Sequence, residues 1–359
     1  MEETLMKILV INPGSTSTKV GIFENANCIY AKTVRHPRCE IERFPNISAQ
    51  KEMRRAVVEE VLQESGIARS SLQAIVGRCG IVKPVESGTF FLNERLYQDL
   101  NSEGALRHAS AFGGIIAYEL SRELGIPAYV VDPATVDEML PEAKLTGIKG
   151  VTRRSIFHAL NSKYVAKRYC RENQKAYKES RLIVAHLGGG ISVSAHLNGR
   201  TIDVNDAAAG DGPFGPERAG SLPVTAVVEL CFSGLYTKET FIAHLFSHSG
   251  MQMHLGSNDL REAMQRIKEG DEQAKLVVEA MAYQVAKQIG AMAAALSGEV
   301  DGIILTGGLA YSDEFIGLIT QRVQKIGPVT VYPGENELQA MAEGALEVLL
   351  KKEEAKEYA

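Results

Sequence analysis

Short apolar runs alternate along most of the chain with longer segments whose apolar residues recur at helical spacing. An apolar run bounded by turn residues predicts a buried strand, and a period of 3.6 residues predicts a helix packed on one side. Strands are expected over residues 6–11, 19–23, 29–34, 73–77, 128–131, 181–185, 191–197, 201–204 and 302–306. Helices are expected over 50–65, 108–124, about 272–297 and about 337–350, with one more after Gly308. This alternation predicts an α/β fold.

The beginning and the middle of the chain share one order of elements. The first strand is followed by the polar segment Asn12–Thr18 and a returning strand, which predicts a hairpin. The strand at 181–185 is followed in the same way by the glycine-rich segment His186–Gly190 and a returning strand. The repetition predicts two similar domains that divide near 147–151.

Composition and charge narrow the classes of partner. The chain has 359 residues, of which 45% are hydrophobic and 23% charged, as in ordinary globular proteins. Because 39 Lys and Arg residues against 44 Asp and Glu residues give a net charge of −5, we expect no broad positive face for nucleic acid. No apolar run reaches the ~18–20 residues of a membrane span. The charged tail, 351–359, is expected to be a frayed, solvated end.

Cysteine use and the first residues predict the compartment. The five cysteines are scattered and contain no C-x-x-C pair, so neither a disulfide framework nor a cysteine zinc site is indicated. The acidic segment at 1–4 leads directly into a strand, unlike a signal peptide. We therefore expect a reduced, soluble, cytoplasmic protein that binds neither membranes nor nucleic acid.

Three turns at strand ends are candidates for binding phosphate. The sequences typical of P-loop NTPases, dinucleotide-binding enzymes, zinc proteases and α/β-hydrolases are missing from the chain. The segments Asn12–Thr18 and His186–Gly190 offer hydroxyls and glycines, so backbone N–H groups can converge there on an anion. Thr306–Gly308 ends a strand before a helix, where open α/β sheets bind ligands. One such turn is weak support, whereas three in one chain favour a phosphate or nucleotide site.

Nine motifs resemble those of the acetokinase family, within the superfamily of acetate and sugar kinases, Hsc70 and actin. They extend over almost the whole chain: INPGSTSTKVGIF (11–23), GRCG (77–80), RHASAFGG (107–114), VVDPATVDEM (130–139), RRSIFHALN (153–161), VAHLGGGIS (184–192), DGPFGPERAGSLP (211–223), SNDLRE (257–262) and LTGGLA (305–310). Within the family the likeness is greatest to the butyrate kinases. The resemblance implies two duplicated ribonuclease H-like (actin-like ATPase) domains around a central cleft. They would comprise residues 1–148, joined by a C-terminal helix at about 338–359, and residues 149–337.

The same resemblance implies reversible, in-line transfer of a phosphoryl group from ATP to butyrate or a related short or branched fatty acid. The products would be an acyl phosphate and ADP, with Mg²⁺ as the metal and a homo-oligomer, a dimer or larger, as the assembly. An acetate or propionate kinase of the same family is the alternative. A chaperone-like or filament-forming ATPase would need a further domain, and an acid-binding protein without catalysis would be expected to lack the matched arginines, histidine and aspartate.

The resemblance also assigns residues to the reaction. Arg78 and Arg218 lie among glycines and would bind the carboxylate and the transition state. His158 would donate a hydrogen bond to the transferred phosphoryl group, although a histidine satisfied within a helix is the simpler alternative. His186 would be structural or lie next to phosphate, and His108 would help to shape the site.

A second set of residues is assigned to the nucleotide and the metal. The phosphate-binding and nucleotide-binding residues would be Asn12, Ser15, Ser17, Lys19, His186, Gly188, Gly189, Gly190, Asp259, Arg261, Thr306, Gly307 and Gly308. An N-cap and an exposed helix charge are the alternative for the pair in SNDLRE. Asp132, at the end of a buried strand, would be catalytic and bind Mg²⁺ together with Glu337, for which Glu335 is the alternative assignment.

Acid specificity is expected to depend on the residues after the first arginine. Acetate kinases tend to carry a bulky aliphatic residue there, whereas Arg78 is followed by Cys79 and Gly80. The missing side-chain volume would open room for a longer acyl chain, and each buried CH₂ is worth roughly 0.8 kcal/mol. Phe157 would form a remaining wall of the acid pocket.

Overall fold

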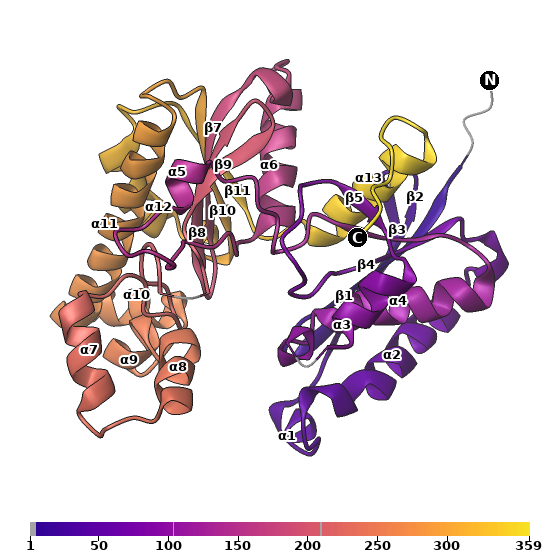
Figure 1. The fold of residues 1–359 in the computed structure, drawn as a ribbon, viewed down its shortest axis with the longest axis horizontal. Coiled ribbons are helices and arrows are strands. Elements are labelled where there is room, and N and C mark those ends of the chain that lie inside the picture. Colours follow the sequence, from indigo (N-terminus) through magenta and orange to yellow (C-terminus); the bar gives the residue numbers. More distant parts are fainter. Residues whose placement is uncertain (1–4, 103, 209) are drawn as a thin grey trace. The chain divides into compact units, whose positions relative to one another are not determined.

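The computed structural model describes residues 5–102, 104–208 and 210–359, which form two compact units (Figure 1). Unit 1 extends to Val136 and resumes at Asn336, and unit 2 comprises Asp137–Glu335. The chain therefore passes from unit 1 to unit 2 after Val136, whereas the sequence analysis placed this division after residue 148. The reason is local, because the N–H of Leu140 donates to the carbonyl of Ile202 at 2.9 Å and its side chain packs on the core of unit 2.

Unit 1 is built on a six-stranded sheet with the order β3-β2-β1-β4-β6-β5. Its strands are β1 (Lys7–Pro13), β2 (Ser17–Glu24), β3 (Asn27–Arg35), β4 (Ala74–Gly77), β5 (Thr89–Phe91) and β6 (Ala128–Val131). The first three form an antiparallel meander, β4 and β6 run parallel to β1, and β5 runs antiparallel to β6. The carboxyl ends of β1, β4 and β6 therefore share one edge of the sheet.

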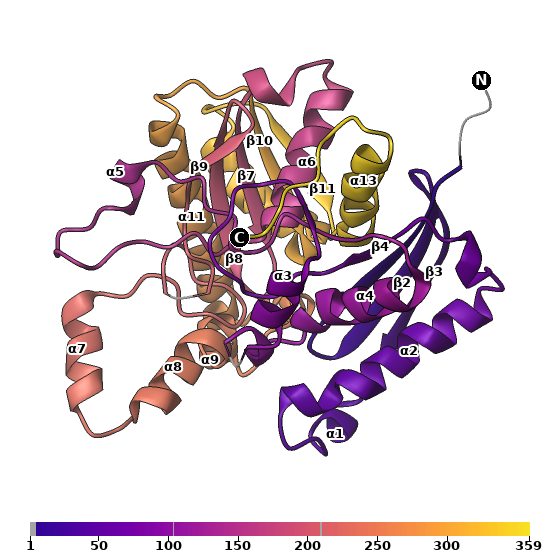
Figure 2. The ribbon, with the colours of Figure 1, turned by 45° about the vertical axis from the view of Figure 1, so that its right-hand side comes forward.

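Helices cover both faces of this sheet. Residues of α2 (Lys51–Glu64) and α4 (Ala111–Leu124) share a hydrophobic core with β1, β2 and β4. The helix α13 (Glu337–Leu349) packs against β1, β4 and β6 from the other side (Figure 2). The unit also contains the shorter helices α1 (Arg38–Ile41) and α3 (Glu94–Leu100).

Unit 2 repeats the arrangement on a five-stranded sheet with the order β11-β10-β7-β8-β9. Its strands are β7 (Arg181–Leu187), β8 (Ile191–Leu197), β9 (Arg200–Val204), β10 (Gly302–Gly307) and β11 (Val329–Pro333). Here too an antiparallel meander, β7-β8-β9, continues through two strands parallel to its first strand. The predicted fold, α/β with a duplicated domain, is confirmed.

One large helical layer and one smaller one enclose the second sheet. On one face lie α9 (Gly250–Leu255), α10 (Leu260–Lys268), α11 (Glu272–Ala295) and α12 (Asp313–Val323). The other face is covered by α6 (Ala159–Glu172). Three further helices, α5 (Pro141–Lys144), α7 (Val224–Phe232) and α8 (Lys238–Ser247), have no buried residues.

The charged tail is ordered against unit 1, so the expectation of a frayed end is wrong. The N–H of Lys356 donates to the carbonyl of Thr89 at 2.8 Å, and the N–H of Phe91 donates to the carbonyl of Lys356 at 2.9 Å. Tyr358 is buried, and its hydroxyl donates to Asp99 Oδ2 at 2.7 Å. One aromatic side chain thus anchors a segment whose composition suggests a solvated end.

Two expectations about the whole chain can be compared with the structure. Within the described residues, no helix combines the length and the apolar composition needed to cross a bilayer. All five cysteines are free thiols, two of them buried and three exposed.

Candidate active site

Polar side chains from distant parts of the sequence meet in unit 1 where β1 and β4 end. Asn12 lies near the end of β1, and Arg78 follows β4, whose last residue, Gly77, pairs with Ile11. Glu337 begins α13 and accepts hydrogen bonds from Asn12 Nδ2 at 2.7 Å and from Arg78 Nη1. The side chains of Arg78 and Glu337 are 16% and 12% exposed. Three of the predicted residues are therefore brought into one ion-paired cluster.

The turn between β1 and β2 is shorter than the sequence suggests. Its tip is the segment 14–16, which is closed by a hydrogen bond from the N–H of Gly14 to the carbonyl of Ser17 at 2.8 Å. Ser15 is exposed at this tip, whereas Ser17 and Lys19 lie half-buried on β2. The expected loop over 12–18 was too long because its outer residues continue the antiparallel ladder, in which Asn12 pairs with Lys19.

Asp132 follows the neighbouring strand β6 and is tied to the backbone of another loop. Its Oδ1 accepts a hydrogen bond from the N–H of Gly88 at 2.7 Å, and its own N–H donates to the carbonyl of Gly88 at 3.0 Å. The residue is 6% exposed and has a φ of +38°, which is uncommon for a residue other than glycine. Such backbone strain tends to occur at functional sites.

One acidic residue of unit 1, Asp132, fits a magnesium ion that is held mainly by its phosphate ligand. Among the described residues, no group of three or more His, Cys, Asp or Glu side chains could hold a metal ion. Mg²⁺ in nucleotide enzymes commonly takes one or two carboxylates together with phosphate oxygens and water. Asp132 suits that role, whereas both oxygens of Glu337 are already bonded to Asn12 and Arg78. The alternative, Glu335, belongs to unit 2.

Two predicted substrate residues have structural explanations in unit 1. A Cβ atom on Gly80 would lie 2.9 Å from Cβ and 3.0 Å from Cα of Ala111, so this glycine is required by the close approach of α4. The argument that its missing side chain opens space for an acyl chain is therefore wrong. His108 is exposed, and its Nδ1 accepts from the N–H of Ser110 at 3.1 Å, just before α4 begins. Cys79, which directly precedes Gly80, is also buried, and burial raises the pKa of its thiol to about 12.

Two predicted histidines of unit 2 are stacked on each other. The rings of His158 and His186 are nearly parallel, with centroids 3.7 Å apart and an angle of 6° between their planes. His158 precedes α6, and its Nδ1 lies 2.9 Å from the hydroxyl of Ser192 on β8. His186 is fully buried on β7, and its Nε2 lies 3.2 Å from Glu335 Oε1. The buried Phe157 directly precedes His158 in the sequence.

Asn161, which sequence reasoning did not single out, holds the second histidine. Its Nδ2 donates to His186 Nδ1 at 3.0 Å and to Thr306 Oγ1 at 3.1 Å, and the side chain is fully buried on α6. Because Nδ1 accepts this bond, the ring proton lies on Nε2, which makes no hydrogen bond to the described residues. Asn161 lies within the motif SIFHALN, but only the fold shows which of its residues reaches the histidine.

Reversing the polarity of that hydrogen bond should move the histidine proton. In Asn161→Asp the carboxylate can only accept, so we expect His186 to adopt the Nδ1–H tautomer, with a loss of about 1–3 kcal/mol in the free energy of unfolding. ¹⁵N NMR of the histidine ring reports the tautomer directly. Asn173→Asp, at the exposed C-terminal end of the same helix, is the matched control. An unchanged Nε2–H signal in Asn161→Asp would contradict the assignment.

Arg218 lies directly on the glycine turn between β7 and β8. A Cβ atom on Gly190 would lie 2.5 Å from its Cζ and 2.9 Å from its Cδ, so only glycine admits the guanidinium. Arg218 Nη1 donates to the carbonyl of Ala207 at 2.6 Å, while the buried Nε has no hydrogen-bond partner among the described residues. Burial lowers the pKa of Arg218, and the charges of Glu217 and Asp206 oppose this effect. The site therefore holds a buried cation with an unused donor.

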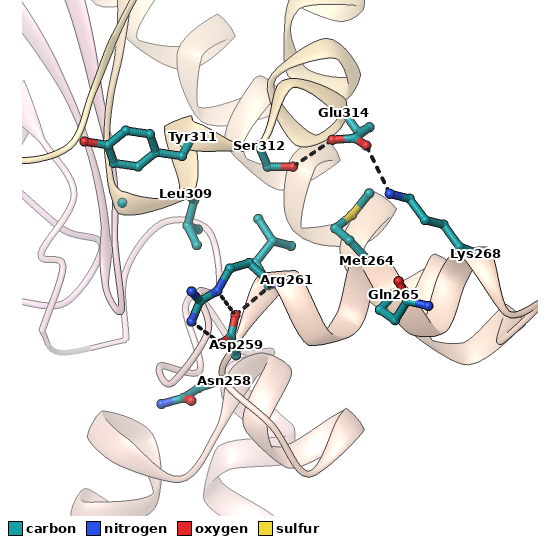
Figure 3. A pocket seen from close by; sticks show the side chains of 12 residues that line it. Asn258, Asp259, Arg261, Met264, Gln265, Lys268, Leu309, Tyr311, Ser312 and Glu314 are labelled. Atoms are coloured by element: carbon teal, nitrogen blue, oxygen red, sulfur yellow. Dashed lines mark hydrogen bonds and ion pairs between the residues drawn. The ribbon is translucent and has the colours of Figure 1, made fainter.

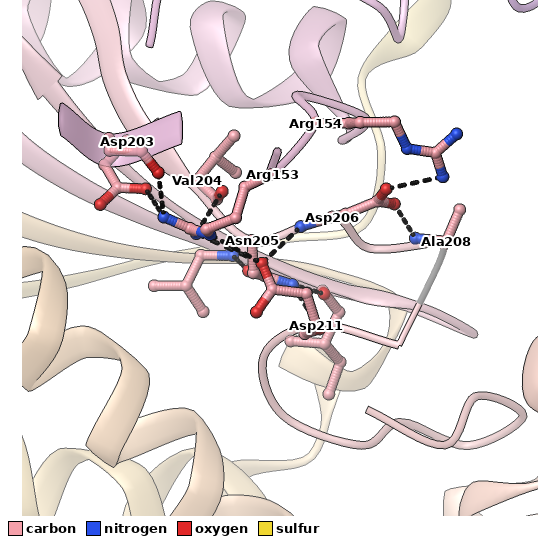
Figure 4. A network of polar contacts seen from close by, with 11 residues as sticks. Arg153, Arg154, Asp203, Val204, Asn205, Asp206, Ala208 and Asp211 are labelled. Atoms are coloured by element: carbon pink, nitrogen blue, oxygen red, sulfur yellow. Dashed lines mark hydrogen bonds and ion pairs between the residues drawn. The ribbon is translucent and has the colours of Figure 1, made fainter. Parts of the chain in front are cut away.

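A network of ion pairs fixes the segment that contacts Arg218 (Figure 4). Arg153 donates to Asp203 Oδ1 at 2.9 Å, to Asp211 Oδ2 at 3.2 Å and to the carbonyl of Val204 at 2.9 Å. Arg154 Nη2 donates to Asp206 Oδ2 at 3.0 Å. Together the two arginines hold the chain on both sides of Ala207, although the sequence offered no reason to select them.

A cavity of about 710 Å³ opens in unit 2 beside α10 and the start of α12 (Figure 3). It is lined by Asn258, Asp259, Leu260, Arg261, Met264, Gln265, Lys268, Gly308, Leu309, Tyr311, Ser312 and Glu314. This volume suits a ligand of nucleoside size. Three predicted nucleotide residues thus line one cavity: Asp259, Arg261 and Gly308.

Other expectations for this region need correction or qualification. Thr306 does not line the cavity, because it is fully buried and its hydroxyl donates to the carbonyl of Gly334 at 3.2 Å. Gly307, with a φ of +93°, supports the turn and is likewise outside the lining. Asp259 lines the cavity and also caps α10, where it accepts from the N–H of Arg261 at 2.8 Å. The Arg261 side chain beside it lowers the pKa of that carboxyl.

Comparison with known proteins identifies the family of this chain and shows which solved structures share its fold. The family model of the acetokinase family matches residues 139–351, more than half of the chain. The crystal structure of Porphyromonas gingivalis acetate kinase is similar with a TM-score of 0.78 and 20% identity, covering 96% of this chain and 100% of that chain. A propionate kinase from Francisella tularensis subsp. tularensis SCHU S4 is similar with a TM-score of 0.73 and 19% identity, covering 94% of this chain and 98% of that chain. Acetate kinase from Entamoeba histolytica is similar with a TM-score of 0.76 and 18% identity, covering 94% of this chain and 98% of that chain. These structures share the two-domain fold of this chain, and the chain belongs to the acetokinase family of phosphotransferases.

Proposed function

We propose that the protein transfers the terminal phosphoryl group of ATP reversibly to butyrate, or to a closely related short or branched fatty acid. The products are an acyl phosphate and ADP. Family membership supports a carboxylate as acceptor and ATP as donor. The structural observation that carries the proposal is the turn at Gly188–Gly190, which is bordered on one side by the stacked histidines and on the other by the buried cation of Arg218.

Each residue of the proposed reaction has a role that its environment suits. Phosphoryl transfer depends mainly on positioning and charge neutralisation, so direct in-line transfer needs cations and hydrogen-bond donors rather than a nucleophile. Arg218 neutralises charge on the transferred phosphoryl group with its guanidinium, which lies against Gly190 of the glycine turn. His158 donates a hydrogen bond to the same group, and Asn161 keeps the neighbouring imidazole of His186 in one orientation.

The carboxylate and the metal are assigned to residues of unit 1. Arg78 gives one edge of its guanidinium to Glu337, and its remaining N–H groups suit a substrate carboxylate. Asp132 would hold Mg²⁺, which neutralises charge on phosphate oxygens when bound. Asn12, Ser15, Ser17 and Lys19 would contact phosphate at the β1–β2 turn. The adenosine would occupy the cavity that contains Asp259, Arg261 and Gly308.

The choice of acid is tested by trapping the acyl phosphate as a hydroxamate. With ATP, Mg²⁺ and the acids from acetate to valerate, including isobutyrate, we expect kcat/KM to be highest at four carbons. A maximum at acetate or propionate would keep the reaction and overturn the chain-length assignment. If no acid gave hydroxamate although ATP bound, the enzyme would not be a carboxylate kinase. The sequence likeness to butyrate kinases supports this preference, because the argument from Gly80 has failed.

We also propose a cytoplasmic homo-oligomer that associates through α7 and α8. The segment exposes a series of large apolar side chains: Leu222, Val224, Val228, Phe232, Leu235 and Ile242. Large apolar side chains that are exposed along one segment are typical of protein interfaces. Phe232 is the most exposed of them, at 86%.

Placing a charge in this patch should weaken association. We expect Phe232→Asp to lower the molar mass measured by light scattering at micromolar concentration, because an interface cannot bury an unpaired carboxylate without a large cost. Gln321→Asp, on the exposed side of α12, is the control for added charge. A wild-type protein that is monomeric at these concentrations would contradict the proposal.

A further inference from the structure

A fully buried arginine lies beneath the β1–β2 turn of unit 1. Arg54 projects from α2, is 0% exposed and heads the largest fully buried side chains among the described residues. Its Nη2 donates to the carbonyl of Ser15 at 3.1 Å. Its Nη1 donates to the carbonyl of Ser17 at 3.1 Å and to Thr18 Oγ1 at 3.3 Å. The guanidinium therefore donates hydrogen bonds both to the tip of the turn and to the first two residues of β2.

The charge of this guanidinium meets neutral groups among the described residues, including the ring of Phe112, whose centroid lies 5.9 Å from Cζ. The remaining acceptor is the neutral Gln50 Oε1, at 3.0 Å from Nη2 and 3.3 Å from Nε, and no carboxylate among the described residues forms an ion pair with Arg54. Burial lowers the pKa of Arg54 to about 10, so the group stays protonated at neutral pH. Buried charges in proteins are normally paired, because an unpaired one is costly.

The nearest titratable neighbour does not change this balance. His36 Nε2 lies 2.8 Å from Thr18 Oγ1, on the far side of the hydroxyl that accepts from Arg54. Burial and the charge of Arg54 lower the pKa of His36 below its ordinary value, although the charge of Glu40 opposes them, so the ring is mainly neutral near pH 7. One positive charge therefore remains beneath the turn.

The same contacts orient a backbone donor outward. The C=O of one residue and the N–H of the next point in opposite directions across a planar trans peptide. Because Arg54 binds the carbonyl of Ser15 from beneath, the N–H of Thr16 points to the outer side of the turn. This N–H donates to none of the described residues, and Thr16 is exposed. An outward donor above a buried cation is an arrangement that attracts an anion.

We propose that Arg54 is a positioning residue for phosphate at the β1–β2 turn. It fixes the turn from beneath, and the bound phosphoryl anion supplies the counter-charge that the fold does not. This inference rests on the proposed function, in which the turn contacts the phosphoryl groups of the nucleotide. It adds a residue that touches neither ligand nor solvent and acts through the backbone of Ser15 and Ser17.

Binding measurements on three variants test the proposal. Arg54→Met keeps the length of the side chain and removes the charge and all five donors, while Arg54→Lys keeps the charge and loses the planar fork. Arg55→Met is the matched control, because the neighbouring arginine bonds to Glu119 and Glu123 and makes no contact with the turn. The probes are a non-hydrolysable ATP analogue with Mg²⁺, and AMP, both titrated calorimetrically into the full-length protein.

We expect Arg54→Met to weaken binding of the ATP analogue at least 10-fold and Arg54→Lys to weaken it less, with AMP affinity unchanged within 2-fold. Equal losses for AMP and the analogue would show a merely structural role and overturn the proposal. The proposal would also be overturned if Arg54→Met bound the ATP analogue as tightly as the control Arg55→Met does. Should Arg54→Met not fold, Arg54→Lys carries the same comparison.

A measurement on the unaltered protein separates this inference from the proposed reaction. Hydrogen exchange of the Thr16 amide should slow when the ATP analogue binds and stay unchanged with AMP. An exchange rate that the analogue does not alter would overturn the proposal. Failure to form any acyl phosphate would instead reject the proposed function and leave these binding results as they stand.

Discussion

Arg218→Ala is expected to lower kcat for acyl phosphate formation by about 10³-fold while the affinity for ATP changes only a few-fold. Arg218 is the buried cation with an unused donor at the Gly188–Gly190 turn, whereas the nucleotide cavity is lined by other residues. Its loss should therefore remove stabilisation of the transition state more than binding of the ground state. Hydroxamate trapping gives kcat, and calorimetry with the ATP analogue gives the affinity.

A substitution that keeps Arg218 in the chain but displaces its guanidinium makes this prediction more specific. Gly190→Ala introduces a Cβ where the guanidinium lies, so we expect Arg218 to be displaced and kcat to fall by about 10²-fold, as small misplacements can cost. Gly317→Ala is the matched control, because a Cβ there meets no atom within 4 Å. If Arg218→Ala and Gly190→Ala both kept wild-type kcat, Arg218 would have no part in the reaction.

The strands of this fold were predictable because buried apolar runs between turn residues leave little choice of structure. The strands at 128–131 and 191–197 have the bounds that the sequence indicated. Segments with weaker patterns were missed, among them the short β5 and the helix α6. The tail shows the limit of composition as a guide, since the buried Tyr358 docks residues that are otherwise highly charged.

Residue types in the candidate site were predictable, whereas their contacts were not. A motif names Arg78 or His186, but the pairing of Arg78 with Glu337 spans 259 positions and depends on how the chain returns to unit 1. The roles of Asn161 and Arg54 likewise arise only when helices pack on strand ends. Gly80 shows the reverse case, because a glycine that looked like an open pocket is explained by the packing of Ala111.

Lys163→Met is expected to lower the free energy of unfolding by about 3–5 kcal/mol. Lys163 and Glu138 form an ion pair whose side chains are 1% and 5% exposed, with Nζ 2.6 Å from Oε2. Lys163 also donates to the carbonyl of Gly199 at 3.1 Å, and the N–H of Thr201 donates to the same Oε2 at 2.8 Å. The substitution removes the cation that lies 2.6 Å from the buried carboxylate of Glu138.

The neighbouring His196 cannot take over the role of the lysine. Burial is the main cause that lowers the pKa of His196 to about 3 in the unaltered protein, and this burial remains when the charge of Lys163 is removed. Its two ring nitrogens already bond to Ser194 Oγ and to the hydroxyl of Tyr177, each at 2.8 Å. The imidazole therefore stays neutral at the pH of the measurement and provides no counter-charge.

A double substitution shows whether the lost stability comes from the stranded charge. Glu138→Leu combined with Lys163→Met replaces the pair by apolar groups, which is often neutral for buried pairs, so most of the loss should be regained in urea unfolding. Lys175→Met, which breaks the exposed pair with Asp301, should cost less than about 1 kcal/mol. If the double variant were as unstable as Lys163→Met, the cost would lie in packing. Glu138 lies two residues after Val136, the last residue of unit 1 before the chain passes into unit 2. In that case packing, and not the ion pair, would hold the start of unit 2 in place.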